Sequence, residues 1–103
     1  MDLQIATRHL RLLSDSTRIR LLFLLEKEEL SVAELAAITQ LAQPRVSTHL
    51  ARLKEARLVN DRRDGVSVFY RLVSEPEDQA LADLWRVLKA QTQDPVAEQD
   101  LER

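Results

Sequence analysis

The stretch SVAELAAITQLAQPRVSTHLARLK, residues 31–54, decides the fold. Ser31 and Glu34 fit the capping-box pattern S-x-x-E, which marks the start of a helix. Residues 39–42 then interrupt the helical pattern. Pro44 restarts it, because proline at a first helical position loses no hydrogen bond. The stretch therefore predicts two short helices joined by a tight turn.

The second of these helices has one apolar and one polar face. Its apolar face holds Val46, Leu50 and Leu53, and its outward face holds Arg45, Thr48 and Arg52. A recognition helix in a DNA major groove needs this division, since the buried side chains fix the helix while the exposed ones reach base edges. An ordinary helical hairpin with a solvated polar face would show the same pattern, so this stretch alone leaves both interpretations open.

The composition indicates one helical domain without cysteine. The chain has 103 residues, of which 45% are hydrophobic and only four are aromatic. The absence of cysteine excludes disulfides, thiol redox sensing and thiolate metal sites. No apolar run approaches the roughly 18 residues of a membrane helix, and the first residues lead into an amphipathic segment and not a signal peptide. We therefore expect one cytoplasmic domain without a membrane partner.

The charges are segregated along the chain. The net charge is −2, yet residues 43–71 hold seven basic and three acidic residues. Contact with phosphate depends on local positive charge, so this region is a candidate for binding nucleic acid. A solvated, charged surface would give the same imbalance.

Two helices and a short strand are expected before the helix-turn-helix. Apolar spacing predicts a first helix over residues 2–13 with a second apolar side, which is typical of a subunit boundary and also of simple core burial. Asp15 is the expected N-cap of a second helix, apolar nearly all round, that ends near Lys27. Leu30 and Ser31 are expected to form a strand of one or two residues.

A hairpin and a last helix are expected after the helix-turn-helix. The apolar period changes there from 3.6 to 2, and Asp64-Gly65 predicts a type I′ turn between two strands. Pro76 is expected to open the last helix. Residues 92–103 lose the pattern and are expected to form a disordered acidic tail, which places the domain at residues 1–91.

The order of elements, α-α-(β)-α-α-β-β-α, predicts a mainly α winged helix-turn-helix fold with a small β-hairpin. Three stretches also resemble the ArsR/SmtB family of transcriptional repressors: LLSDSTRIRLLFLL (12–25), LSVAELAAITQLAQPRVSTHLARLKEARLV (30–59) and RRDGVSVFYRL (62–72). The resemblance implies a homodimer joined through its first and last helices. It also implies repression in the bacterial or archaeal cytosol, in association with the nucleoid, and an effector that releases the operator.

Three departures from the family pattern stand out. Where metal-sensing members carry cysteines, this chain has Ser31 and Ala33, and its last helix has Asp78 and Asp83 but no histidine. We therefore expect no metal site, no cofactor, and an effector other than a thiol-bound metal. A small organic molecule, an oxyanion or no effector stay open. Arg57 replaces the family's helix-ending glycine, so it must adopt a strained left-handed conformation or the helix must end differently.

Seven polar residues are candidates for DNA contact: Gln43, Arg45, Ser47, Thr48, Arg52, Arg62 and Arg63. The first four line the start of the recognition helix, where arginine suits guanine and glutamine suits adenine. Arg52 suits phosphate, and the last two suit a wing over the backbone or minor groove. A solvated helix start capped by Gln43 is the alternative. His49 is expected either to orient the helix by packing or to contact phosphate.

Apolar residues of the two terminal helices are expected to form the dimer interface: Leu3, Leu10, Leu81, Leu84, Trp85 and Leu88. Tyr70 is expected to pack in the core or at the base of the wing. These side chains would otherwise leave an apolar stripe exposed to water.

Together these features predict a DNA-binding repressor that binds an inverted-repeat operator as a homodimer. Its expected partners are double-stranded DNA, a second copy of itself and an unidentified small-molecule effector. An enzyme is not expected, because the sequence has no glycine-rich loop and no serine–histidine–acid or paired-carboxylate constellation. A dimeric winged-helix adaptor that binds proteins instead of DNA is the alternative, and the outward face of residues 43–52 would then be acidic or apolar.

Overall fold

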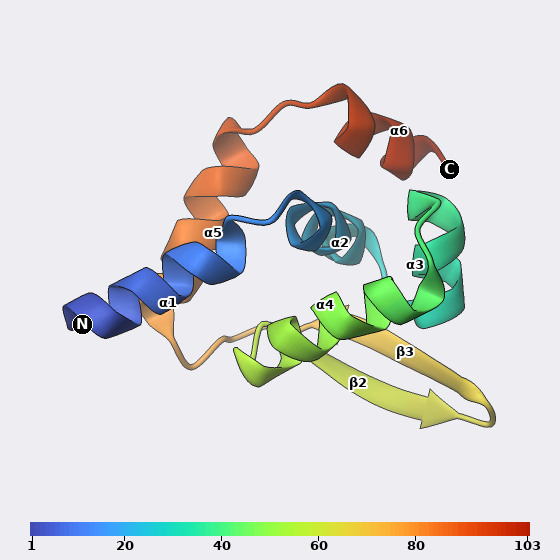
Figure 1. Cartoon of the computed structure of the whole chain (residues 1–103), viewed down its shortest axis with the longest axis horizontal. Coiled ribbons are helices and arrows are strands. Elements are labelled where there is room, and N and C mark those ends of the chain that lie inside the picture. The colour runs from blue at the N-terminus through green and yellow to red at the C-terminus, as the bar shows by residue number, and fades with distance from the viewer.

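The computed structural model covers residues 1–103 and contains six helices and three strands (Figure 1). In chain order these are α1 (Leu3–Leu13), α2 (Ser16–Lys27), β1 (Leu30–Ser31), α3 (Val32–Thr39), α4 (Gln43–Glu55), β2 (Val59–Asp64), β3 (Ser67–Leu72), α5 (Gln79–Gln91) and α6 (Pro95–Glu102). The expected order of elements is confirmed up to α5. No helix combines the length and the apolar composition that a membrane span requires.

Side-chain caps fix where the first helices begin. Asp2 Oδ1 accepts a 2.8 Å hydrogen bond from the Ile5 amide at the start of α1. Asp15 caps α2 as predicted, because its Oδ1 accepts hydrogen bonds from the second and third amides of that helix. The Ser31–Glu34 capping box of α3 is also present in both directions. Each cap satisfies amides that have no partner within the helix.

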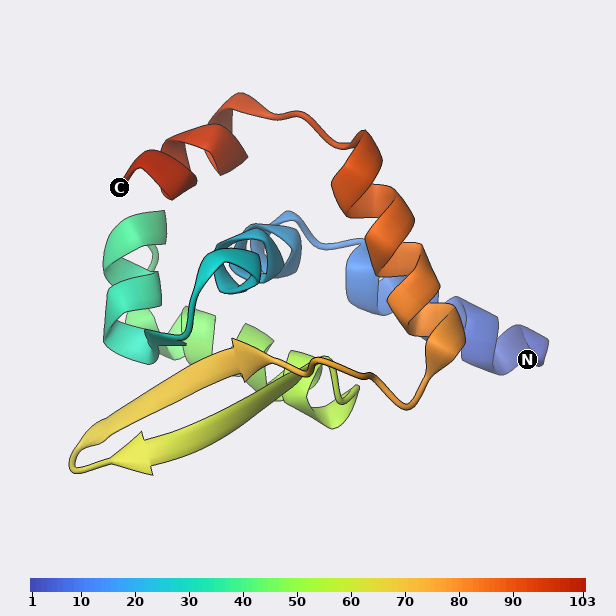
Figure 2. The same cartoon turned by 180° about the vertical axis from the view of Figure 1, so that it is seen from behind.

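The last amphipathic helix begins later than predicted. Asp78 caps α5 by accepting a hydrogen bond from the Leu81 amide, so the helix starts at Gln79 and not at Pro76. The residues between β3 and α5 form an irregular connection (Figure 2). A carboxylate in the N-cap position provides a stronger start than a proline without a cap nearby.

The core lies between α2 and the helix-turn-helix. Leu21 and Leu22 of α2 are fully buried, as are Val46, Leu50 and Leu53 on the inner face of α4. Each such side chain contributes roughly 1.5–3 kcal/mol by leaving water, so the apolar face of α4 anchors it firmly. The same anchoring leaves the opposite face of α4 outward, as the sequence predicts.

The sheet is antiparallel with strand order β1-β3-β2. Asp64 pairs with Ser67, so the two turn residues are Gly65 and Val66, one position later than predicted. Gly65 has φ +62° and Val66 does not have positive φ, which fits a type II′ turn and not the predicted type I′. The hairpin itself is confirmed, and it extends as a wing beside α4 (Figure 2).

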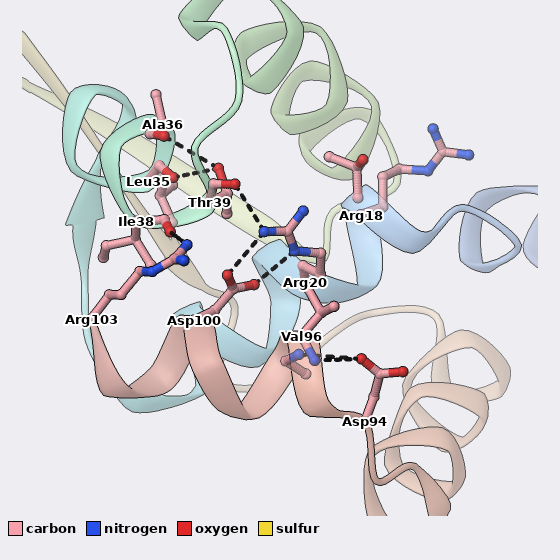
Figure 3. Close-up of polar contacts among 12 residues, drawn as sticks. Arg18, Arg20, Leu35, Ala36, Ile38, Thr39, Asp94, Val96, Asp100 and Arg103 are labelled. Atoms are coloured by element: carbon pink, nitrogen blue, oxygen red, sulfur yellow. Dashed lines mark hydrogen bonds and ion pairs between the residues drawn. The ribbon is translucent and has the colours of Figure 1, made fainter.

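The C-terminal residues differ from the expected disordered tail. Residues Pro95–Glu102 form α6, whose start is capped by the Asp94 carboxylate. The helix returns across α2 and the end of α3, and its Asp100 side chain is buried beside Arg20 (Figure 3). The sequence pattern missed α6 because the buried contact is polar and no apolar stripe marks the helix.

Candidate nucleic-acid interface

The recognition helix α4 presents an uncapped N-terminus at the surface. Its N-cap position is Ala42, and no side chain bonds to the first amides of the helix. Gln43 is therefore the first helical residue and does not cap the helix, which removes the alternative role considered for it. Free amides at a helix N-terminus, together with the helix dipole, favour a phosphate group.

The five predicted contact residues of α4 are all exposed: Gln43, Arg45, Ser47, Thr48 and Arg52. Few hydrogen bonds hold these side chains to the rest of the chain. Arg45 donates a long 3.3 Å hydrogen bond to the Thr17 hydroxyl. The Thr48 hydroxyl donates to the Pro44 carbonyl at 2.9 Å and can still accept a hydrogen bond. The structure thus brings these five side chains together on the outer surface of one helix.

The two arginines of β2 do not act as a pair. Neighbouring residues of a strand point to opposite faces, so Arg62 and Arg63 diverge. Arg62 donates two hydrogen bonds to Glu29 Oε1, at 2.6 and 2.9 Å, and its guanidinium lies 4.6 Å from the centre of the Phe69 ring. The hydrogen bond from Arg62 lowers the pKa of Glu29.

Of these two arginines, only Arg63 is therefore free of an ion pair. It is exposed and has no carboxylate within 4 Å. In the free chain Glu29, at the end of the α2–β1 connection, holds Arg62, so a contact of Arg62 with DNA stays a prediction that requires this exposed pair to open. No local pattern indicates this pairing, since the two residues are 33 positions apart.

A further ion pair fixes the wing against the recognition helix. Lys54 Nζ lies 2.9 Å from Asp61 Oδ1, and the hydrogen bond between them raises the pKa of Lys54. An exposed pair of this kind contributes little to stability, about 0–1 kcal/mol. Its effect is positional, because it joins the last turn of α4 to β2.

A polar network supports α4 from behind. Arg18 Nη1 donates to His49 Nδ1 at 3.1 Å, and Arg18 also donates to the carbonyls of Leu12 at 2.6 Å and Arg11 at 3.0 Å. His49 is therefore held from the inside of the protein, which favours the packing role over a phosphate contact. Arg18 was missed as a positioning residue, although it follows the predicted cap Asp15 by one helical turn.

The environment of this network shifts two pKa values. Burial lowers the pKa of His49, and the charges of Arg18, Arg45 and Arg52 lower it further, against the opposing effect of Asp15. Burial acts to raise the pKa of Asp15, but backbone hydrogen bonds and the neighbouring positive charges outweigh it and lower the value. A neutral His49 can accept the hydrogen bond from Arg18, as the geometry requires.

The residues predicted for the dimer interface differ in how far the single chain buries them. Leu3 and Leu10 of α1 are 83% and 61% exposed, and Leu84 and Leu88 of α5 are partly buried. Leu81 and Trp85 are buried within the single chain, so their expected place in the interface is corrected to the core. Trp85 stacks edge-on against Phe23, and its Nε1 donates to Glu26 Oε1 at 2.8 Å.

The histidines and acids of the chain do not converge. His9 lies on α1 and His49 on α4. No three histidine, aspartate or glutamate side chains lie close enough to hold a metal ion. Within one chain, the residues present do not fit the three or four converging ligands of a zinc site.

Known proteins are similar to this chain in both sequence and fold. Residues 15–61 match the model of the family described as "Bacterial regulatory protein, arsR family". KmtR, an HTH-type transcriptional regulator of Mycobacterium tuberculosis, is 48% identical over 73 residues, which are 71% of this chain and 56% of KmtR. The chain thus spans little more than half the length of that relative.

Two other relatives have solved structures. The transcriptional activator HlyU of Vibrio cholerae is 38% identical over 80% of this chain and 75% of its own length. The structure of reduced HlyU covers 85% of this chain and 90% of that chain with a TM-score of 0.68.

The homodimeric winged helix-turn-helix DNA-binding domain of Mb0332 from Mycobacterium bovis is 27% identical. It covers 85% of this chain and 78% of that chain, also with a TM-score of 0.68. This chain belongs to the ArsR family, which is a family of transcriptional regulators and not of enzymes.

Proposed function

We propose that this chain binds double-stranded DNA as a homodimer at an inverted-repeat operator and represses transcription there. The observation that carries the proposal is the outer face of α4. It is exposed, polar and basic, and it lies opposite an apolar face that is fully buried. A protein-binding adaptor would need an apolar or acidic patch at this place, because interface cores are depleted in charged residues.

Each contact residue has a role that fits its position on α4. Arg45 and Gln43 lie in the first turn, where a recognition helix reaches base edges, and they suit guanine and adenine respectively. Ser47 and Thr48 offer hydroxyl groups to either a base or a phosphate. Arg52 lies two turns further along and serves the phosphate backbone.

Phosphate contacts flank the recognition helix. The free amides at the start of α4 suit one phosphate, and Arg63 on the wing suits another. The excess of positive charge between residues 43 and 71 attracts the DNA to this side, although the whole chain is negatively charged. These contacts fix the register of the helix but carry no sequence information.

The dimer is proposed from the exposed leucines of α1. Leu3 and Leu10 lie on one side of that helix, and Leu84 and Leu88 of α5 add a second apolar surface. The homodimeric state of the Mb0332 domain supports the same assembly here. A two-fold dimer presents two recognition helices, which requires half-sites about one helical turn, or ~10 bp, apart.

Footprinting on the DNA upstream of the gene tests the proposal. We expect a protected inverted repeat at nanomolar to micromolar protein, and in transcription with purified polymerase we expect fewer transcripts as protein is added. Protection with more transcripts would replace repression by activation. No protection on any upstream fragment, with random and genomic DNA bound equally weakly, would favour the adaptor.

A further inference from the structure

A basic cleft of about 670 Å³ lies beside the recognition helix. Its walls come from α1, the start of α2, the C-terminal end of α4 and the segment that leads into α5. Here it is called the α1–α4 cleft. It is separate from the apolar side of α1 that carries Leu3 and Leu10, neither of which lines it.

The cleft concentrates positive charge that the chain does not neutralise. Five arginines and three carboxylates line it, and Arg57 is already paired with Glu77 at 2.7 Å. Arg8, Arg11 and Arg52 are exposed, and their guanidinium groups have no carboxylate within 4 Å. Three unpaired guanidinium groups around one cleft suit a ligand with several anionic oxygens, because arginine binds carboxylate and phosphate in a bidentate manner.

A buried histidine lies at the wall of the cleft. His9 is only 7% exposed, and its Nε2 lies 2.9 Å from Asp78 Oδ2, within ion-pair distance but without a hydrogen bond. Buried polar atoms are nearly always hydrogen-bonded, so this nitrogen is a polar group of the wall that a ligand in the cleft can engage.

Hydrogen bonds link the cleft to the recognition helix. Arg18 lines it and bridges the end of α1, through the carbonyls of Arg11 and Leu12, to His49 in the middle of α4. Arg52 extends from α4 itself and is the residue assigned above to a DNA phosphate. A ligand in the cleft that engages Arg52 therefore competes with DNA for the same guanidinium group.

We propose that the α1–α4 cleft binds a small organic or inorganic anion with two or more charged groups, of the tricarboxylate or diphosphate class, and that this ligand weakens operator binding. Arg8 and Arg11 hold the ligand from α1, and Arg52 holds it from α4. The regulatory half of this inference rests on the proposed DNA binding, whereas anion binding by the free protein does not.

Isothermal titration calorimetry of the full chain without DNA tests the site directly. The probes are citrate and inorganic pyrophosphate, with sodium chloride of matched ionic strength as the control. The unaltered protein should bind at least one probe with one site per subunit. Arg8→Gln combined with Arg11→Gln should weaken that binding at least tenfold. Arg71→Gln, which removes an exposed arginine of β3 outside the cleft, should change it less than twofold.

A second readout locates the ligand. The ring resonances of His9 should shift as the probe saturates, and those of His49 should follow through Arg18. Circular dichroism confirms that the variants are folded. No saturable binding of either probe, or an equal loss in Arg71→Gln, overturns the proposal.

A gel-shift experiment distinguishes an anion-binding site from arginines that only contact the DNA backbone. The bound probe should weaken operator binding by the unaltered protein and leave the double variant unaffected. If instead the double variant loses affinity for all DNA and the free protein binds neither probe, the arginines serve the DNA backbone and the anion site is refuted. If both probes bind while no DNA does, the site stands and only the proposed DNA-binding function fails.

Discussion

Arg20 of α2 and Asp100 of α6 form a bidentate pair although they are 80 residues apart in the sequence. Arg20 Nε donates to Asp100 Oδ2 at 2.7 Å and Nη2 donates to Oδ1 at 2.9 Å. The Arg20 Nη2 also donates to the Thr39 carbonyl at 2.9 Å, while Arg103 donates to the Ile38 carbonyl (Figure 3). Two arginines thereby satisfy carbonyls at the end of α3, next to the turn of the helix-turn-helix.

Loss of this pair should destabilise the fold and loosen that turn. Asp100→Ala leaves Arg20 unpaired, which should cost about 3 kcal/mol, the low end for a buried pair because part of Arg20 reaches solvent. Urea denaturation measures the loss, and amide hydrogen exchange should become faster around Thr39. Glu102→Gln, an exposed acid on the same helix, should change stability by less than about 0.5 kcal/mol. Equal effects of the two substitutions would show that α6 does not dock as described.

Arg57 shows how far the sequence alone could predict a local conformation. The missing glycine predicted a strained left-handed residue as one of two outcomes, and Arg57 has φ +61° directly after α4. Gln40 at the end of α3 has φ +59°, and nothing in the sequence singled it out. A polar residue in a turn can adopt many backbone conformations, so Gln40 could not be predicted. A non-glycine residue at a position where the family has glycine leaves two outcomes, a strained left-handed conformation or a different end to the helix.

Replacing Arg57 should therefore have opposite effects for glycine and alanine. Arg57→Gly relieves the left-handed strain and should stabilise the fold by up to about 1 kcal/mol, after the greater entropy of glycine in the unfolded chain is included. Arg57→Ala keeps the strain and loses only the exposed ion pair with Glu77, so it should be neutral or slightly destabilising. Thermal unfolding compares the two, and a less stable glycine variant would mean that the conformation carries no strain.

The parts of the fold with strong local signals were predictable, and those that depend on distant polar partners were not. The helix-turn-helix, the hairpin and the Asp15 cap are predictable because the residues that indicate each of them lie within a few positions of one another. The Asp100 contact of α6, the Glu29 partner of Arg62 and the Arg18–His49 link each join residues at least 31 positions apart. The spacing of Leu81 and Trp85 predicts an apolar stripe but does not reveal whether a second subunit or the core of the same chain covers it.

The pH dependence of stability should reveal the environment of His49. Its pKa is lowered in the folded protein, mainly by burial, so the unfolded chain binds more protons once the pH falls below about 6.5. The contribution of His49 is therefore complete above that pH and is lost as the pH falls toward its lowered folded pKa. Urea denaturation from pH 5 to pH 8 measures this contribution.

The variant His49→Gln removes that titration and keeps every other titratable side chain. The free energy of unfolding should fall less steeply with acid in the variant than in the unaltered protein below pH 6.5. The difference between the two curves isolates His49, because the two proteins differ in that side chain alone. Parallel curves would mean that His49 is protonated equally easily in the folded and unfolded states.

The proposed dimer is best tested on α1. Leu10→Glu adds a charge to a side chain that is 61% exposed in one chain, so it should spare the core and weaken association alone. Burial of that unpaired charge should cost about 3 kcal/mol or more, which moves the midpoint of association by about a hundredfold. Val66→Glu at the tip of the wing is the control. Sedimentation equilibrium that shows a monomer for the unaltered protein at micromolar concentration would refute the dimer.

The central claim is that the outer face of α4 reads DNA, with Arg45 on bases and Arg52 on phosphate. The most direct measurement is the affinity of Arg45→Ala and Arg52→Ala for operator and for random DNA at several salt concentrations. Arg45→Ala should lose roughly 1–3 kcal/mol on the operator and little on random DNA, whereas Arg52→Ala should weaken both alike and flatten the salt dependence. Equal losses on both DNAs for Arg45→Ala would contradict this orientation of the helix, and no loss for either variant would contradict DNA recognition by α4.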